Sequence, residues 1–173
     1  MNRSFSRRLA ERLDLVSEWS GRLVAWLTLS MVLVTFVIVV LRYAFDLGWI
    51  ALQESVTYQH ALVFLLGAAY TFKHQGHVRV DIFYQRLSPC GRAWVDLLGD
   101  LVLMLPVTGF IFWSSWDYVG MSWGQHESSQ EAGGLPGVYL LKTTILLMAV
   151  LLLVQGIADV LRQWSIISGN GND

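Results

Sequence analysis

Residues 23–41 read LVAWLTLSMVLVTFVIVVL, an apolar run without a charged side chain. A helix rises about 1.5 Å per residue, so this run is long enough to cross a hydrocarbon core about 30 Å thick. Three more mostly apolar runs of spanning length follow at Ile50–Phe72, Ala93–Trp116 and Val138–Ala158. The sequence therefore predicts an all-α integral membrane protein with four transmembrane helices.

The composition agrees with this interpretation. Of the 173 residues, 54% are hydrophobic and 14% are charged, whereas a soluble domain usually has about 25% charged residues. We expect residues 23–164 to form one membrane domain, because four helices leave no room for a separate soluble domain. Residues 165–173 are polar and rich in Gly and Asn, and they are predicted to be a disordered tail.

The twelve Lys and Arg residues are distributed unevenly among the segments that flank the four runs. Nearly all lie before the first run, between the second and third, or after the fourth: Arg3, Arg7, Arg8, Arg12, Arg22, Lys73, Arg79, Arg86, Arg92 and Arg162. The other two connections contain only Arg42, and Lys142 lies just inside the fourth run. Cytoplasmic loops carry an excess of Lys and Arg. Both termini are therefore predicted to be cytoplasmic.

Two segments outside the runs are predicted to be helical. Residues 1–22 are expected to form an amphipathic cytoplasmic helix, because apolar residues recur there at helical spacing: Leu9, Leu13, Val16 and Trp19. Between the second and third runs, Val80–Tyr84 is apolar enough to lie on the membrane surface. Ser88 and Pro89 then indicate a helix start, since a Ser hydroxyl caps a free N–H and Pro suits the first helical position.

Charges inside the predicted spans need compensation, because a charge at the bilayer centre costs about 2.5–3.5 kcal/mol on insertion scales. Glu54, Arg42 and Lys142 have similar predicted depths near the outer face. We hypothesise that Glu54 pairs with Arg42 or Lys142 and fastens that half of the bundle. The alternative is that each side chain extends separately to the headgroups.

Two further sets of polar residues are candidate ion, proton or metal sites. Asp96 and Asp100 are four residues apart and share a helix face. One interpretation is that they bind a cation or relay protons. The favoured interpretation is that they lie in the inner membrane interface, or face cations of the inner loop or of a partner. His74 and His77 have a possible metal spacing but lack a second pair of ligands, and His60 is interpreted as a packing residue.

No catalytic motif is present, so an ATPase or hydrolase is not indicated. Four plain spans without repeats or a polar midplane site also differ from a complete secondary transporter. The residues favour a membrane subunit that serves a larger assembly, with no cofactor or metal of its own and no nucleic-acid partner.

Several motifs resemble the small membrane subunit of tripartite ATP-independent periplasmic (TRAP) transporters. The resemblance covers nearly the whole chain and rests on motifs in order: Arg42-Tyr43-x-Phe45, Trp49 with Gln53-Glu54, His77-Val78-Arg79-Val80-Asp81, and Gly134-Leu135-Pro136 with Gln155. The family more often has two Glu residues where this chain has Gln53-Glu54. Pro136 is expected near the start of the last helix.

This resemblance implies a multi-pass protein of the bacterial inner membrane. A separate large membrane subunit would move an organic acid inward by an elevator motion, with sodium coupling in that subunit. A periplasmic substrate-binding protein would deliver the substrate. The small subunit would be a scaffold that contacts the large subunit, the binding protein and membrane lipid.

Interface candidates follow from this implied role. Gly67, Ala68 and Ala69 would pack on the large subunit, while Arg79 and Asp81 would pair with each other, with lipid phosphate or with that subunit. Glu127 and Glu131 lie in a cation-free outer loop and would meet the binding protein. The alternative function is a haem-b membrane anchor of a respiratory oxidoreductase, for which only His60 lies well inside a span.

Overall fold

The computed structural model describes residues 3–77 and 81–169, and these residues are almost entirely helical. The helices are α1 (Arg3–Phe45), α2 (Ile50–Lys73), α3 (Asp81–Tyr84), α4 (Pro89–Gly99), the π-helical segment η1 (Asp100–Met104), α5 (Leu105–Gly124) and α6 (Val138–Ile167). No strand occurs in the described ranges, and one isolated bridge joins Ser128 and Pro136. The predicted all-α class is confirmed.

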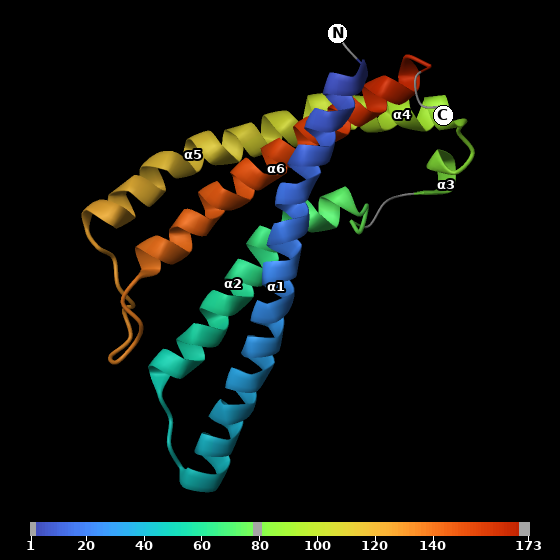
Figure 1. Ribbon diagram of the computed structural model, residues 1–173. Helices are drawn as coiled ribbons and strands as arrows, with labels where there is room; N and C mark the ends of the chain where they lie inside the picture. The colour runs from blue at the N-terminus through green and yellow to red at the C-terminus, as the bar shows by residue number, and fades with distance from the viewer. Residues whose placement is uncertain (1–2, 78–80, 170–173) are drawn as a thin grey trace.

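The long helices form two antiparallel hairpins that diverge from each other (Figure 1). One consists of α1 and α2, and the other consists of the rod α4–η1–α5 and α6. The turn 46–49 and the loop 125–137 lie at one end, here called the loop end. The start of α1, the ends of α2 and α6, and the short helix α3 (Asp81–Tyr84) lie at the other, here called the termini end. Because α6 packs against α1, α2, α4 and α5, it joins the two hairpins.

Three stretches among the described residues are long and apolar enough to cross a membrane: Ala10–Phe45, Pro89–Gly124 and Val138–Ile167. They contain the first, third and fourth predicted spans. α2 has the bounds expected for the second span but is not among the three stretches, since it carries Gln53, Glu54, Gln59 and His60. Much of its surface is partly covered by α1 and α6.

Local sequence explains where the rod α4–η1–α5 begins and why it contains a π-helical turn. The Ser88 hydroxyl accepts a hydrogen bond of 3.2 Å from the Gly91 N–H, and Pro89 is the first helical residue, as predicted. Farther along, the Leu105 N–H bonds to the Asp100 carbonyl, one residue beyond the usual partner. Pro106 follows and has no N–H to donate. Asp100–Met104 is therefore a wide π turn inside an otherwise α-helical rod.

Two segment boundaries differ from the prediction. The amphipathic segment is not a separate helix, because α1 is continuous from Arg3 to Phe45. Ser17 and Ser20 are buried, while Val16 and Trp19 are exposed. The packed face of this segment is therefore polar, and the apolar residues Val16 and Trp19 lie on its outer surface. The predicted tail is wrong for residues 165–167, which continue α6. Residues 170–173 lie outside the described ranges.

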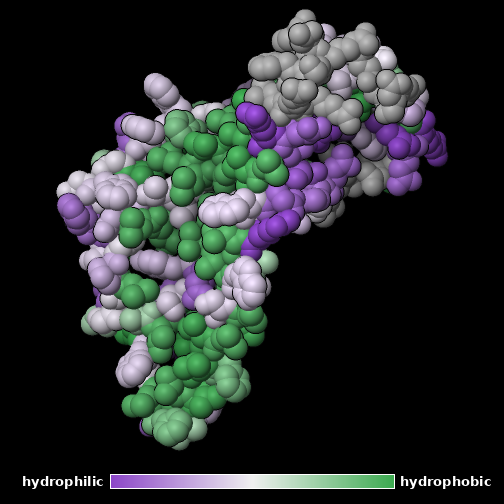
Figure 2. All heavy atoms as spheres, in the orientation of Figure 1, coloured by the Kyte–Doolittle hydropathy of each residue, from purple (hydrophilic) through white to green (hydrophobic). Residues whose placement is uncertain are grey.

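The surface has the polarity of a membrane protein. Hydrophobic residues cover most of the visible face of the hairpins, whereas hydrophilic residues gather toward the termini end (Figure 2). Large apolar side chains are exposed along α1 and α5, including Trp26 at 73% and Trp113 at 81%. Exposed apolar surface on this scale indicates contact with lipid or a protein partner rather than with water.

Candidate functional site

At the loop end, Glu54 connects α2 to the loop 125–137. Its carboxylate accepts a hydrogen bond from the Ser129 hydroxyl and another of 2.6 Å from the Leu135 N–H. Gly134 allows this approach, because a Cβ there would lie 2.4 Å from the Ser129 Oγ and 2.8 Å from the Glu54 Oε2. Glu54 thus fixes the loop of one hairpin against the helix of the other.

A second pair at the loop end closes the α5–α6 hairpin. The Lys142 ammonium lies 2.5 Å from the Glu127 carboxylate, which also accepts a hydrogen bond of 2.6 Å from the Ser122 hydroxyl. The same ammonium lies 4.1 Å from the centre of the Tyr118 ring. The hydrogen bond from Lys142, and then that from Ser122, lower the pKa of Glu127 below its usual value. Glu127 therefore carries its charge at neutral pH.

These contacts correct the predicted pairing of Glu54 with Arg42 or Lys142, which is wrong. Lys142 reaches Glu127 within its own hairpin, and Glu54 is satisfied by a hydroxyl and a backbone N–H of the loop. Arg42 is exposed at the end of α1. No periodic feature of the sequence indicated that the loop folds back onto α2.

Toward the termini end, Gln155 connects α6 to α1. Its side chain is fully buried. It accepts a hydrogen bond of 2.5 Å from the Ser17 hydroxyl and donates one of 2.9 Å to the Asp14 carboxylate. A polar side chain inside a helix pair is stable only when its donors and acceptors are matched, and both ends of this amide are matched.

Arg162 extends the contacts of Gln155 into a network. It donates two hydrogen bonds to Asp14, at 3.0 and 2.9 Å, and one of 2.7 Å to Asp159. Gln163 donates one of 3.2 Å to the other Asp159 oxygen. We call the residues Asp14, Ser17, Gln155, Asp159, Arg162 and Gln163 the α1–α6 network.

The α1–α2 hairpin has its own polar contact at the termini end. Lys73 donates a hydrogen bond of 3.0 Å to Glu18 and another of 3.3 Å to the Asp14 carbonyl. Near this contact the two helices approach closely, since a Cβ on Gly21 would lie 2.2 Å from the Tyr70 ring. These contacts fasten α2 to α1 at the same end of the molecule where the α1–α6 network joins the two hairpins.

Other predicted interface residues do not join these clusters. Tyr43 and Trp49 are 83% and 60% exposed beside the turn 46–49, and the His77 ring lies 6.2 Å from that of Phe72. Pro136 lies two residues before α6, as expected. Arg79 lies outside the described residues. Asp81 begins α3, and its side chain is outside the described part.

The predicted role of the small residues in α2 is corrected. Ala69 is fully buried within this chain, and a Cβ on Gly67 would lie 3.6 Å from Val24 of α1. Ala69 therefore packs within this chain and is not open to a partner, whereas Gly67 and Ala68 are half-buried and their contact with the large subunit stays a prediction. His60 is exposed and is not a packing residue.

Sequence reasoning found Gln155 but missed its partners. Asp14 and Ser17 are spaced to share a helix face, as are Asp159, Arg162 and Gln163. The same stretch of α1 also has apolar residues at helical spacing, so the spacing alone does not show which face packs against α6. Within the described ranges, no group of three His, Cys, Asp or Glu side chains is placed to hold a metal ion. The clusters join helices and contain no arrangement of a nucleophile and a base.

The helical fold and its exposed apolar surface define an integral membrane protein with several candidate spans. The family description of the DctQ component of tripartite ATP-independent periplasmic transporters matches residues 31–166. The chain belongs to this family, which supplies a transporter component rather than an enzyme.

A protein of Haemophilus influenzae described as a TRAP transporter small permease is similar to this chain. The two are 31% identical over 75 residues, which cover 43% of this chain and 47% of the relative. The similarity thus spans about half of the relative's length. No solved structure matches.

Proposed function

We propose that this chain is the small permease subunit of a TRAP transporter and acts as its static scaffold. The large membrane subunit would carry the substrate and the sodium sites, and a periplasmic protein would deliver an organic acid. The observation that carries this proposal is the fastening of the two hairpins by polar contacts at both ends, from Glu54 to the loop 125–137 and from Asp14 to Gln155 and Arg162. A frame that resists the sliding of a transport domain needs such contacts, and it needs no transport site of its own.

We further propose that α2 is the fourth span and that both termini are cytoplasmic. The 24 residues of α2 measure about 36 Å, enough to cross the core. Its polar residues are compatible with a span because α1 and α6 pack on it. The termini end also gathers the cations that the positive-inside rule assigns to the cytoplasm. Reporter tags at residues 1 and 173 that report opposite sides would refute this topology.

Docking of the binding protein is proposed at the loop 125–137. Glu131 is exposed in this loop, whereas Glu127 is held by Lys142 and Ser122. Glu131 is therefore the better docking candidate, and Glu127 acts mainly by shaping the loop. The hydrogen bonds to Glu54 keep the loop in one conformation before docking.

The test is substrate uptake by the complete transporter in vesicles. Glu131→Lys should raise the concentration of binding protein needed for half-maximal uptake, because it reverses a charge that internal contacts do not require. Asp117→Lys, at an exposed position of α5, is the matched charge reversal. If both variants have the same effect, general negative potential rather than loop docking is responsible. If neither has an effect, the docking proposal fails.

A further inference from the structure

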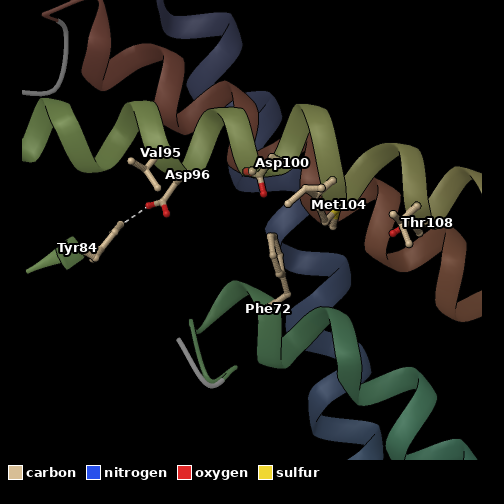
Figure 3. A pocket seen from close by; sticks show the side chains of 10 residues that line it. Phe72, Tyr84, Val95, Asp96, Asp100, Met104 and Thr108 are labelled. Carbon is tan, nitrogen blue, oxygen red and sulfur yellow. Dashed lines mark hydrogen bonds between the residues drawn. The ribbon is translucent and has the colours of Figure 1, made fainter. Parts of the chain in front are cut away.

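Asp96 and Asp100 line an open groove of about 550 Å³ between α2 and the rod α4–η1–α5 (Figure 3). They share one face of the rod, as their spacing predicted. Asp96 accepts a hydrogen bond of 2.6 Å from the Tyr84 hydroxyl, and all three side chains have further partners within this chain. The described side chains of this groove therefore leave no carboxylate open to a ligand.

A second groove lies on the exposed side of α1, toward the termini end. Its volume is about 500 Å³, and its lining residues are Leu15, Val16, Glu18, Trp19 and Arg22. Leu15, Trp19 and Arg22 follow one another at intervals of four and three residues, so they share one face of the helix. Leu15 and Trp19 are 66% and 69% exposed. This groove therefore combines an open apolar surface with a cation.

Among the described residues, the charge of Arg22 is only weakly compensated. Its side chain is 78% exposed, and its Nε lies 3.9 Å from the Glu18 carboxylate. That carboxylate lies closer to Lys73 and His74, at 3.0 and 3.4 Å. Asp14, one turn before Glu18, belongs to the α1–α6 network. Because an exposed ion pair contributes little, Arg22 can bind another anion without losing a strong contact.

The position of Arg22 along α1 places this cation at the edge of the membrane. Arg22 directly precedes the apolar run 23–41, so its long side chain reaches the boundary between the hydrocarbon core and the headgroups. Under the proposed topology this is the cytoplasmic boundary, where the phosphates of that leaflet lie. Trp19 lies one turn closer to the N-terminus, at a depth where an indole N–H finds polar partners. The cation and the indole therefore face lipid headgroups.

The rest of this face favours lipid over a protein helix. Trp26, Leu29, Leu33 and Phe36 continue the same face toward the loop end, and all four are exposed. Helices that pack together in membranes usually meet through small residues or interhelical hydrogen bonds. Large apolar side chains in a row offer little of either, but they suit acyl chains. A soluble anion would gain nothing from them.

The charge near the groove favours a headgroup that is negative overall. Arg12 is exposed on the same face, three residues before Leu15. Glu11, the neighbour of Arg12, has a partner elsewhere in the chain. Two exposed cations on one face attract a phosphate and repel the ammonium of a zwitterionic headgroup. A phospholipid with a net negative charge therefore matches this surface better than a zwitterionic one.

We propose that the groove on α1 binds an anionic phospholipid of the cytoplasmic leaflet. Arg22 donates charge-assisted hydrogen bonds to the phosphate, and the Trp19 indole N–H donates to the phosphate or to an ester carbonyl. One acyl chain lies along Trp26 and Leu29. The inference rests on the proposed topology of the termini and does not depend on the proposed role in transport.

The first test measures how closely lipids approach Trp19 in vesicles that contain the full chain. Brominated lipids quench a nearby indole, and the part due to Trp19 is the difference between the wild type and Trp19→Phe. Brominated phosphatidylglycerol should quench this part more than brominated phosphatidylcholine, with a preference of about fivefold or more, as expected for one Arg near the surface. Equal quenching by the two lipids, or quenching by neither, would overturn the inference.

The second test assigns the preference to Arg22. Arg22→Gln should reduce the preference for phosphatidylglycerol about fivefold. Arg86→Gln is the matched control, because Arg86 is exposed after α3 at the same end of the molecule. It should leave the preference unchanged. Equal losses from the two variants would show that a general surface potential attracts the lipid and would overturn the inference.

Circular dichroism of each variant in the same vesicles shows whether it is folded. If Arg22→Gln fails to fold, Arg22→Lys replaces it and should keep the preference, since it keeps the charge; loss of the preference by this folded variant contradicts the inference. Excess inorganic phosphate should leave the preference unchanged, and its abolition would assign the groove to a soluble anion instead.

The same quenching measured on the complex with the large subunit tests a protein occupant. Trp19 should still be quenched by phosphatidylglycerol in that complex. Loss of all lipid quenching there would assign the groove to the large subunit and overturn the inference. A reporter tag that places residue 1 outside the cell would instead refute the proposed topology.

Discussion

Replacement of Gln155 by Leu removes the two hydrogen bonds that join α6 to α1 while nearly preserving side-chain volume. The Ser17 hydroxyl loses its acceptor, and Asp14 loses one donor but keeps two from Arg162. A buried polar group left without a partner costs about 1–3 kcal/mol. Because Ser17 and Gln155 are both fully buried, we expect Gln155→Leu to reduce the free energy of unfolding by about 2–3 kcal/mol.

The contribution of the Ser17–Gln155 pair is measured by a double-mutant cycle. Hydrogen bonds between membrane helices average about 0.6 kcal/mol in such cycles and reach about 1.7 kcal/mol. Full burial places this pair near the upper value, so the coupling energy between Ser17→Ala and Gln155→Leu should be about 1.5 kcal/mol. Removal of both partners should therefore cost less than the sum of the single changes.

Unfolding of the purified protein in mixed micelles of increasing SDS content, followed by circular dichroism, gives these free energies. Ser20→Ala is the matched control, because the Ser20 hydroxyl bonds within its own helix to the Ser17 carbonyl. Ser20→Ala and Gln155→Leu should be additive. Additivity of Ser17→Ala and Gln155→Leu within about 0.3 kcal/mol would refute the argument that this bond fastens α1 to α6.

Three other outcomes are expected. Gly21→Ala should destabilise the protein by about 1–2 kcal/mol in the same assay, because overpacking against Tyr70 exceeds the gain in helix propensity. Gly120 has open space around it, so Gly120→Ala should not destabilise the protein. Gly134→Ala should speed hydrogen exchange at the Leu135 N–H by displacing Glu54, and Gly124→Ala should leave that rate unchanged. The pKa of Glu127 is lowered in the folded protein. The Glu127 carboxylate therefore contributes its full stabilisation above the unfolded pKa of about 4.3, and this stabilisation is lost as the pH falls through the lower folded pKa. Thermal unfolding followed between pH 7 and 3 should show the loss in the wild type and less of it in Glu127→Gln.

Periodic features of the sequence predicted the helices well. The bounds expected for the second span, Ile50–Phe72, differ from those of α2 by one residue, and the Ser88–Pro89 start is correct. These features depend on local propensity and on the length needed to cross a bilayer, both of which can be read from a single chain. The π turn at Asp100–Met104 was not predicted, because it packs against α6 where Gly156 lets Met104 approach closely, and such a contact leaves no periodic pattern in the sequence.

Side-chain partners were harder to predict than helix positions. Glu54 and Lys142 were expected to need partners, yet the actual partners of Glu54 come from a loop whose path has no periodic signal. Several residues can satisfy a carboxylate at one depth, and the choice depends on the fold of the 125–137 loop. Predicted contacts with other subunits, such as those of Arg79 and Glu131, stay predictions.

The polarity of α1 explains how one small chain could serve both as a frame and as a partner. In water, apolar residues would pack inward, but in lipid the hydrophobic effect supplies no attraction between helices. Specific packing must then come from close approach and hydrogen bonds, which is what Gly21, Ser17 and Gln155 provide. The large apolar side chains are consequently left on the outside, as at Trp19 and Trp26. A chain fastened inside by polar groups therefore keeps its apolar surface free for lipid and, under the proposed function, for the large subunit.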